Sequence, residues 1–261
     1  MVNRQRNEIS AETKRTVRQR CGFGCVICGT MPYQYHHLTQ WSETQDDSAE
    51  NLVILCSSHH DEITRKILSN DTIRHFAVNP HNLRLDRSPG RKHFLNHRIP
   101  KIRIGGNKYA FDFNINPDDT FYPIVLHNNA LMEIQNEDGF VLINIHLRDK
   151  LGKTLFKIDR GELSVTTQAW DCETSGRSVI IRNRPREILL DFSFEEDGLS
   201  INRFLYSINK SRISITKSGI FHAGQALRLT GNTFLSQIGV CFGPPRIVPC
   251  GSYFEFNTKA H

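Results

Sequence analysis

The chain has 261 residues, of which 38% are apolar and 23% are charged. These proportions are those of a globular protein and exclude a disordered chain, and the length allows one large or two ordinary domains. The 33 basic side chains exceed the 27 acidic ones, and this net charge of +6 favours a polyanionic partner.

The cysteines and the apolar runs indicate the compartment. Seven cysteines are an odd number, and their spacing lacks the framework of a disulfide-stapled secreted domain. No apolar run approaches the roughly 20 residues that a membrane helix needs. The start at Met1-Val-Asn-Arg-Gln-Arg has no apolar stretch of the kind found in signal peptides. We therefore predict a reduced, cytoplasmic protein with no membrane segment.

The first predicted element is a basic helix over residues 10–20, with Ser10 as its N-cap. It ends at Cys21-Gly-Phe-Gly, whose two glycines oppose helical continuation. Arg15, Arg18 and Arg20 lie in this helix and can contact phosphates, because basic side chains displace counterions from a polyanion. The alternative is an amphipathic helix with ordinary surface charge.

Two short strands and two helices are predicted next. The strands cover residues 33–38 and 51–55, and a polar loop over residues 39–49 joins them. A helix is expected after the second strand, with Ile63 and Ile67 in a small apolar cluster. A second helix over residues 71–78 stops before Pro80, because the residue preceding proline is driven out of helical geometry.

The segment between residues 25 and 60 concentrates metal donors. Thiolate and imidazole are the usual zinc ligands, and a structural zinc site is a closed tetrahedron of four such groups. Two residues between paired donors let one tight turn direct both donors at a single ion. The predicted structural zinc set is therefore Cys25, Cys28, Cys56 and His59.

Three further histidines in this segment exceed the four donors of a structural site. They are His36, His37 and His60, and they suggest a second, catalytic metal centre.

The run from Cys25 to about Pro80 resembles the HNH nucleases, which are built on the ββα-metal fold. The resemblance covers about the first third of the chain. It rests on Cys25-x-x-Cys28, Tyr35-His36-His37, the run from Glu50-Asn51 to Cys56, and Ser58-His59-His60.

The resemblance implies a metal-dependent DNA endonuclease. His37 would be the general base, since an imidazole can accept a proton from water near neutral pH. His36 and His60 would hold one catalytic divalent ion, Mg²⁺ or Mn²⁺, and Asn51 would brace the loop that carries the base. DNA would be the partner, with Arg15, Arg18 and Arg20 on its phosphates.

Two positions depart from the family pattern. His59 stands where the subgroup commonly has the second cysteine of a Cys-x-x-Cys pair, which is a conservative change of zinc ligand. Thr64 stands where some relatives have a further metal-binding histidine. The catalytic ion would then keep several waters, which suits magnesium or manganese and leaves zinc or nickel open.

The character of the sequence changes near residue 100. Short apolar or alternating runs follow one another between turn signals such as Asp138-Gly139 and Asp197-Gly198. We predict a linker over residues 81–99 and an all-β, antiparallel, sandwich-like domain over residues 100–261. The expected fold class is α+β, with a small zinc-stabilised ββα-metal module over residues 1–80 preceding that domain.

The expected function is DNA cleavage by a bacterial or phage restriction or defence-type nuclease. The β domain would serve targeting, sensing or oligomerisation, and double-strand cleavage would need a homodimer or two successive nicks. A second hypothesis is a non-catalytic zinc-dependent DNA-binding protein. A third keeps the nuclease and makes the β domain a sensor of a modified base or signal.

Overall fold

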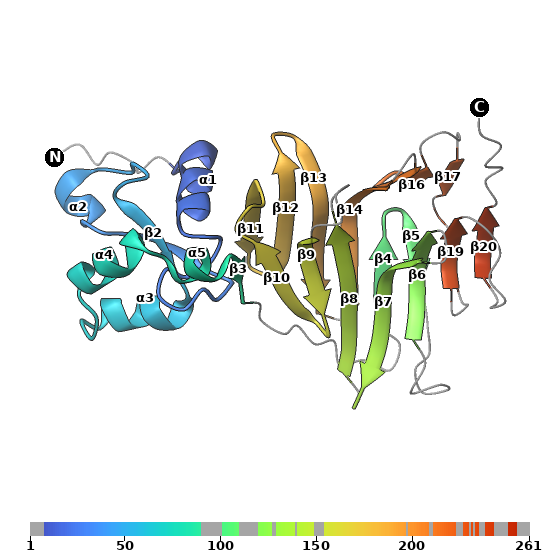
Figure 1. Cartoon of the computed structure of the whole chain (residues 1–261), viewed down its shortest axis with the longest axis horizontal. Helices are drawn as coiled ribbons and strands as arrows, with labels where there is room; N and C mark the ends of the chain where they lie inside the picture. Colours follow the sequence, from blue (N-terminus) through green and yellow to red (C-terminus); the bar gives the residue numbers. More distant parts are fainter. Residues whose placement is uncertain are drawn as a thin grey trace. The chain divides into compact units, whose positions relative to one another are not determined.

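The structure is a computed structural model, which has an α+β fold with few helices and mostly antiparallel or mixed sheets (Figure 1). It describes residues 8–89, 101–109, 120–126, 129–138, 140–148, 154–196, 198–208, 211–222, 227–229, 231, 233–234, 238–242 and 250–254. In these ranges, no helix has the length and apolar character needed to cross a lipid bilayer.

The chain divides into two compact units, and the first combines residues 1–89 with the distant segment 165–176. Its elements are α1 (Ala11–Arg20), β1 (Gln34–His37), α2 (Trp41–Thr44), β2 (Leu52–Leu55), α3 (Ser57–Thr64), α4 (Asn70–Val78), α5 (His81–Leu85), β3 (Arg87–Ser88) and β11 (Asp171–Ser175). Residues 81–88, expected as linker, thus form α5 and β3 of this unit. Residues 90–100 lie outside the described ranges.

The helix α1 begins and ends where the sequence predicts. The Ser10 hydroxyl accepts a hydrogen bond from the Thr13 backbone N–H at 3.0 Å, which satisfies one of the free donors of the first turn. Gly22 and Phe23 then adopt φ values of 67° and 62°, and the Phe23 N–H donates to the Arg18 carbonyl. This left-handed turn ends the helix at the predicted place.

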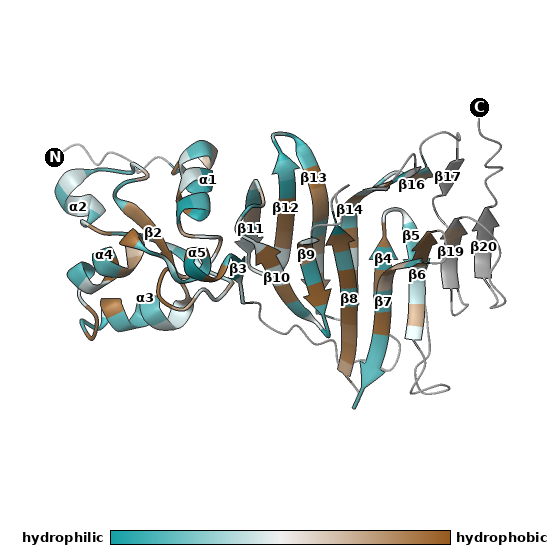
Figure 2. Ribbon diagram, in the orientation of Figure 1, coloured by the Kyte–Doolittle hydropathy of each residue, from teal (hydrophilic) through white to brown (hydrophobic). Residues whose placement is uncertain are grey.

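The core of the first unit is the two-stranded antiparallel sheet of β1 and β2. All four residues of β2 are fully buried, and Figure 2 shows that this strand is hydrophobic along its length. Burying each such side chain contributes about 1.5–3 kcal/mol. The register places His37 opposite Leu52 and His36 opposite Val53, so the buried strand fixes the position of both histidines.

The predicted place of Ile67 in this core is wrong. The α3 helix ends at Thr64, and Lys66 adopts a φ of 61°. The chain therefore turns away before Ile67, whose side chain is 68% exposed. Ile73 of α4 is fully buried.

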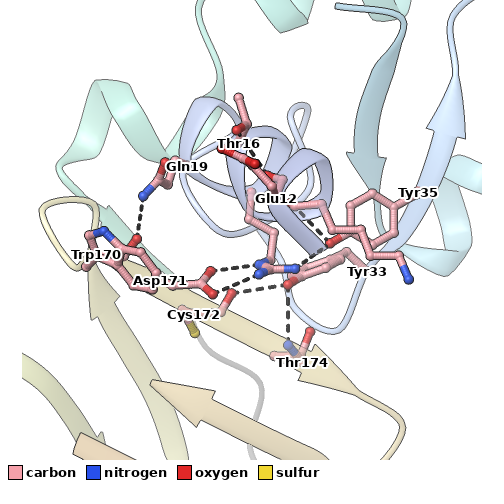
Figure 3. A network of polar contacts seen from close by, with 11 residues as sticks. Glu12, Thr16, Gln19, Tyr33, Tyr35, Trp170, Asp171, Cys172 and Thr174 are labelled. Atoms are coloured by element: carbon pink, nitrogen blue, oxygen red, sulfur yellow. Dashed lines mark hydrogen bonds and ion pairs between the residues drawn. The ribbon is translucent and has the colours of Figure 1, made fainter. Parts of the chain in front are cut away.

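Within the first unit, a buried ion pair joins the segment 165–176 to the N-terminal residues. The Arg18 guanidinium donates from Nε and Nη2 to the two carboxylate oxygens of Asp171, both at 2.8 Å, and the two side chains are 4% and 3% exposed. Its Nη1 donates to the Tyr35 hydroxyl at 2.7 Å. Figure 3 shows this network between α1, β1 and β11.

Two more contacts continue the attachment of this segment. The Tyr33 hydroxyl donates to the Cys172 carbonyl at 3.1 Å and accepts from the Thr174 N–H at 3.3 Å (Figure 3). At the start of the same segment, Val165 pairs with Ser88 of β3 in antiparallel register. Side-chain and main-chain bonds thus both join residues far apart in the sequence.

The second unit, residues 90–164 and 177–261, consists of β strands in its described ranges. They are β4 (Lys101–Ile104), β5 (Asn107–Tyr109), β6 (Thr120–Leu126), β7 (Asn129–Glu137), β8 (Phe140–Arg148), β9 (Thr154–Asp159), β12 (Ser178–Arg184), β13 (Glu187–Glu195), β14 (Gly198–Ile208), β15 (Ser211–Thr216), β16 (Gly219–His222), β17 (Leu227–Leu229), β18 (Thr233–Phe234), β19 (Ile238–Phe242) and β20 (Cys250–Phe254). The strand β10 (Glu162–Thr166) crosses the boundary between the units.

These strands form two sheets of mixed direction. One contains the order β20-β19-β6-β7-β8-β9, and the other contains β12-β13-β14-β15-β16-β17. Most neighbours are antiparallel hairpin partners, but β19 runs parallel to β6 and to β20, and β4 runs parallel to β14. The expectation of an antiparallel domain therefore holds for most neighbours but not for all, because β6 and β14 also pair in parallel register with β19 and β4, which are distant from them in the sequence.

Replacing Asp171 with Asn should lower the free energy of unfolding of the first unit by about 3–5 kcal/mol, because Arg18 is left as a buried charge without its counter-ion. Asp61→Asn is the matched control, since Asp61 pairs with Arg65 on the surface at 2.9 Å. That exposed pair should contribute less than about 1 kcal/mol. Urea denaturation measures both changes, and equal losses would contradict the role given to Asp171.

Candidate metal centre

Four zinc-type donors come together from two places in the chain, the turn at residues 25–28 (the knuckle) and the start of α3. The ligand atoms of Cys25, Cys28, Cys56 and His59 all lie within 4.8 Å of one another. Cys25 is buried and the other three side chains are half-buried. His59 presents Nδ1, at 3.4 Å from the Cys25 sulfur and 3.2 Å from the Cys56 sulfur.

These separations fit a tetrahedral cation. Zinc–sulfur bonds of about 2.3 Å at tetrahedral angles place two sulfurs about 3.8 Å apart, and a sulfur and an imidazole nitrogen about 3.6 Å apart. The Cys28 and Cys56 sulfurs are 3.7 Å apart. Three sulfurs and one nitrogen are a closed, soft donor set, so this cluster can bind a metal such as zinc.

The local charge state also suits a metal ligand. The hydrogen bond between the Cys25 and Cys28 side chains lowers the pKa of Cys28 and raises that of Cys25, so this pair favours one thiolate, on Cys28. Cys21, four residues before the cluster, behaves differently. Burial raises its pKa to about 11, which keeps it a neutral thiol outside the donor set.

The knuckle that carries Cys25 and Cys28 is braced by Asn82 of α5. The Asn82 amide is fully buried and donates to the carbonyls of Gly22 and Gly29 at 2.8 and 3.0 Å. Gly29 has a φ of 73°, and a Cβ there would lie 1.9 Å from Asn82 Oδ1. Glycine at this position therefore lets the amide approach the turn.

A second group of imidazoles adjoins the cluster. The rings of His36 and His60 are 5.5 Å apart, with their planes at 85°. His36 Nε2 lies 3.1 Å from Asn70 Oδ1. Burial lowers the pKa of His36, which favours the neutral, ligand-competent imidazole. These residues come from β1, α3 and the first residue of α4.

The Thr64 hydroxyl takes no part in this group. It donates to the His60 carbonyl at 2.8 Å, one helical turn back. Its hydrogen-bonding capacity is directed along the helix. That Thr64 is a poor substitute for a metal-binding histidine stays a prediction.

His37 is held by a carboxylate that the sequence did not single out. His37 Nε2 lies 2.8 Å from Asp47 Oδ1, and the other oxygen of Asp47 accepts from the Trp41 indole N–H at 3.1 Å. If Nε2 carries the proton, the lone pair of the ring lies on Nδ1. Asp47 and Trp41 thus position an imidazole that can accept a proton.

Asn51 fastens the loop that follows His37. Its side chain accepts from the Thr39 N–H at 2.8 Å and donates to the carbonyls of Thr39 and Asp46 at 3.0 and 2.9 Å. The residue is 8% exposed. All the polar atoms of this amide are used within the loop, which is the arrangement expected of a brace.

The three arginines predicted to bind phosphate differ in their surroundings. The prediction that Arg18 contacts DNA is wrong, because its guanidinium is buried against Asp171. The Arg15 guanidinium lies 4.7 Å over the Trp170 ring, and Arg20 donates to the Leu52 carbonyl. Phosphate binding by Arg15 and Arg20 stays a prediction.

Sequence reasoning missed Asp47, Asn70, Asn82 and the segment 165–176. Asp47 and Asn70 sit in a loop and at a helix start, where acidic and amide residues are common for capping alone. Asp47 comes close to His37, and Asn70 to His36, only through the folded path of the intervening chain, which the sequence pattern does not show. The one available signal was the position of Asp47 in the polar loop that joins the two predicted strands.

The chain matches no protein-family model, no curated protein and no solved structure. What the site can do is therefore decided by its own donor atoms and their geometry. A closed four-donor cluster can bind a metal such as zinc, and an imidazole group adjoins it.

Removing one sulfur should abolish metal binding by the cluster. We expect about one zinc ion per chain in the wild type and less than about a tenth of that in Cys28→Ser, because a structural site needs all four ligands. Cys172→Ala removes a buried thiol of the same unit outside the cluster and should keep its zinc. Elemental analysis decides, and undiminished zinc in Cys28→Ser would exclude Cys28 as a ligand.

The knuckle glycine allows a matched test of close packing. Gly29→Ala should destabilise the first unit by more than about 2 kcal/mol, because it adds a clash with Asn82 to a left-handed backbone. Gly176→Ala, with a φ of 56° and nothing within 4 Å, should cost only the backbone strain of about 1 kcal/mol. Thermal unfolding compares them, and equal shifts would exclude the Asn82 contact as the cause.

Proposed function

We propose that the chain is a metal-dependent DNA endonuclease of the HNH type. In this proposal the first unit is a zinc-stabilised ββα-metal module, in which β1, β2 and α3 supply the two strands and the helix. The observation that carries it is the meeting of His36 and His60 across 5.5 Å, with His37 on the adjacent position of β1 held by Asp47.

The two histidines of β1 have different neighbours. Successive side chains of a strand point to opposite faces. His36 accordingly contacts His60 and Asn70, whereas His37 contacts Asp47. This division places the proposed cation ligand and the proposed base on neighbouring positions of one strand.

The donor set proposed for the catalytic cation is His36 and His60, with the amide oxygen of Asn70 beside them. Two imidazoles and an amide leave room for several waters, which suits Mg²⁺ or Mn²⁺, whereas the imidazoles themselves leave zinc or nickel open. A divalent cation bound there would stabilise negative charge on the phosphate and on the departing oxygen.

The protein side chains supply the proton transfer. His37 would remove a proton from the attacking water through Nδ1, while the Asp47 carboxylate holds Nε2–H and stabilises the imidazolium that results. Trp41 keeps Asp47 in place by its indole N–H. Asn51 holds the loop from which Asp47 approaches, through its bond to the Asp46 carbonyl.

A non-catalytic zinc-dependent DNA-binding protein is the second candidate. The observation that favours it is Thr64, whose hydroxyl is turned to the helix backbone and gives the cation no third imidazole. Plasmid relaxation with and without Mg²⁺ or Mn²⁺ separates the two, because binding alone leaves supercoiled DNA intact.

Replacing His37 with Ala should reduce plasmid nicking by about 10²–10⁴-fold, the usual contribution of a positioned general base. Zinc content should not change, because His37 lies outside the Cys/His cluster. His75→Ala, on the exposed face of α4, is the matched control and should nick at the wild-type rate. Nicking by His37→Ala at the wild-type rate would remove the assigned base.

Asp47→Asn should lower the rate of plasmid nicking by about tenfold or more, because the amide no longer stabilises the imidazolium that results when the proposed base accepts a proton. Zinc content should not change, because Asp47 lies outside the Cys/His cluster. Plasmid nicking and elemental analysis measure the two effects, and nicking at the wild-type rate would exclude Asp47 as the partner of the base.

A further inference from the structure

The second unit contains two adjoining cavities, with volumes of about 530 and 630 Å³. The first lies where β8, β13 and β14 bring Leu147, Leu189 and Leu205 together, so both sheets line it. The second continues along β13, β14 and β15. The two share lining residues, among them Arg184 and Arg212. Both are open to solvent, the second more widely than the first, so a ligand would lie across an exposed surface.

Arginines dominate the polar lining of both cavities. The five that line them are Arg148, Arg184, Arg186, Arg203 and Arg212. Among the described lining residues the single carboxylate is that of Glu187, so four positive charges are in excess here. Residues 101–261 as a whole have 19 basic and 17 acidic side chains, an excess of two. The positive charge of this part of the chain is therefore concentrated at the cavities.

Glu187 offsets one of these arginines. Its Oε2 accepts from Arg184 Nε and Nη2 at 3.1 and 2.7 Å, and its Oε1 accepts from the Asn183 amide at 3.1 Å. The hydrogen bond from Asn183 lowers the pKa of Glu187, and the charges of Arg184 and Arg212 act in the same direction. Glu187 thus stays ionised and fixes Arg184, and the other four arginines line the same two cavities.

An aromatic ring lies beside the charge. Tyr206 lines the first cavity, and its ring stacks on Phe204 with centroids 6.4 Å apart and planes at 15°. Burial raises the pKa of Tyr206, whereas the charge of Arg148 opposes that shift. The phenol is therefore neutral at physiological pH and near Arg148.

We propose that these cavities bind a nucleotide, with its phosphates on the arginines and its base against Tyr206 and the leucine wall. Guanidinium groups suit phosphate because their planar fork donates two parallel hydrogen bonds. Aromatic side chains accept a base by stacking. The proposal concerns the second unit and does not depend on nuclease activity in the first.

The test uses the full chain and isothermal titration with adenosine triphosphate, inorganic phosphate and a short DNA duplex. Adenosine triphosphate should bind to the wild type. The substitutions Arg148→Gln and Arg212→Gln should each lower the affinity for adenosine triphosphate about tenfold or more. Tyr206→Leu should lower the affinity for adenosine triphosphate while leaving the affinity for inorganic phosphate unchanged. Arg160→Gln, which removes an arginine paired with Glu137 on the same unit, is the matched control and should bind as the wild type.

Three outcomes would overturn the proposal. They are the absence of adenosine triphosphate binding, equal binding by all arginine variants, and duplex binding that depends on Arg148 and Arg212 without any binding of the nucleotide. The last result would assign the arginines to a DNA backbone. His37→Ala should bind adenosine triphosphate as the wild type does, so failure of the nuclease proposal remains distinguishable from failure of this one.

Discussion

The bidentate ion pair between Arg18 and Asp171 joins two parts of the chain that are 153 residues apart. Both charges are almost fully removed from water, so the pair is tolerated only because each donor and acceptor is matched. Tyr35 completes the arginine side, and Tyr33 binds the backbone of the same strand. Since both tyrosines flank or belong to the histidine-bearing strand β1, the segment 165–176 supports the strand from which His36 and His37 project to opposite faces.

The zinc-type cluster and the imidazole group share one short helix. Consecutive helical residues point about 100° apart, so His59 can face the sulfurs while His60 faces His36. The His60 N–H donates to the Cys56 carbonyl at 2.9 Å, which fixes the first turn of α3 to a member of the cluster. A change at the cluster is therefore transmitted to His60 through a single turn of backbone, and stability and activity are expected to fall together.

Much of the first unit could be predicted because its signals are local. Ser10 caps α1 through its own side chain, Pro80 ends α4, and the four zinc-type donors follow a spacing that a tight turn imposes. Ile67, Arg18 and the linker were misjudged for one physical reason. Whether a side chain is buried depends on partners that are distant in sequence, and neither Asp171 nor the left-handed turn at Lys66 leaves a periodic pattern. The parallel strand pairs of the second unit were missed for the same reason.

The proposed base shows how a charged residue can be kept next to a cation site without binding the cation. Asp47 lies in the loop between β1 and β2, and both its oxygens are used, one on His37 and one on Trp41. A carboxylate held in this way is a poor competitor for a divalent ion, because each oxygen would have to exchange an existing hydrogen bond for the metal. The His36 ring, by contrast, contacts an imidazole and a neutral amide. The carboxylate is thereby placed on the side of His37, where the proposed mechanism would form an imidazolium, and neutral donors lie on the side of His36, where the proposed cation would bind.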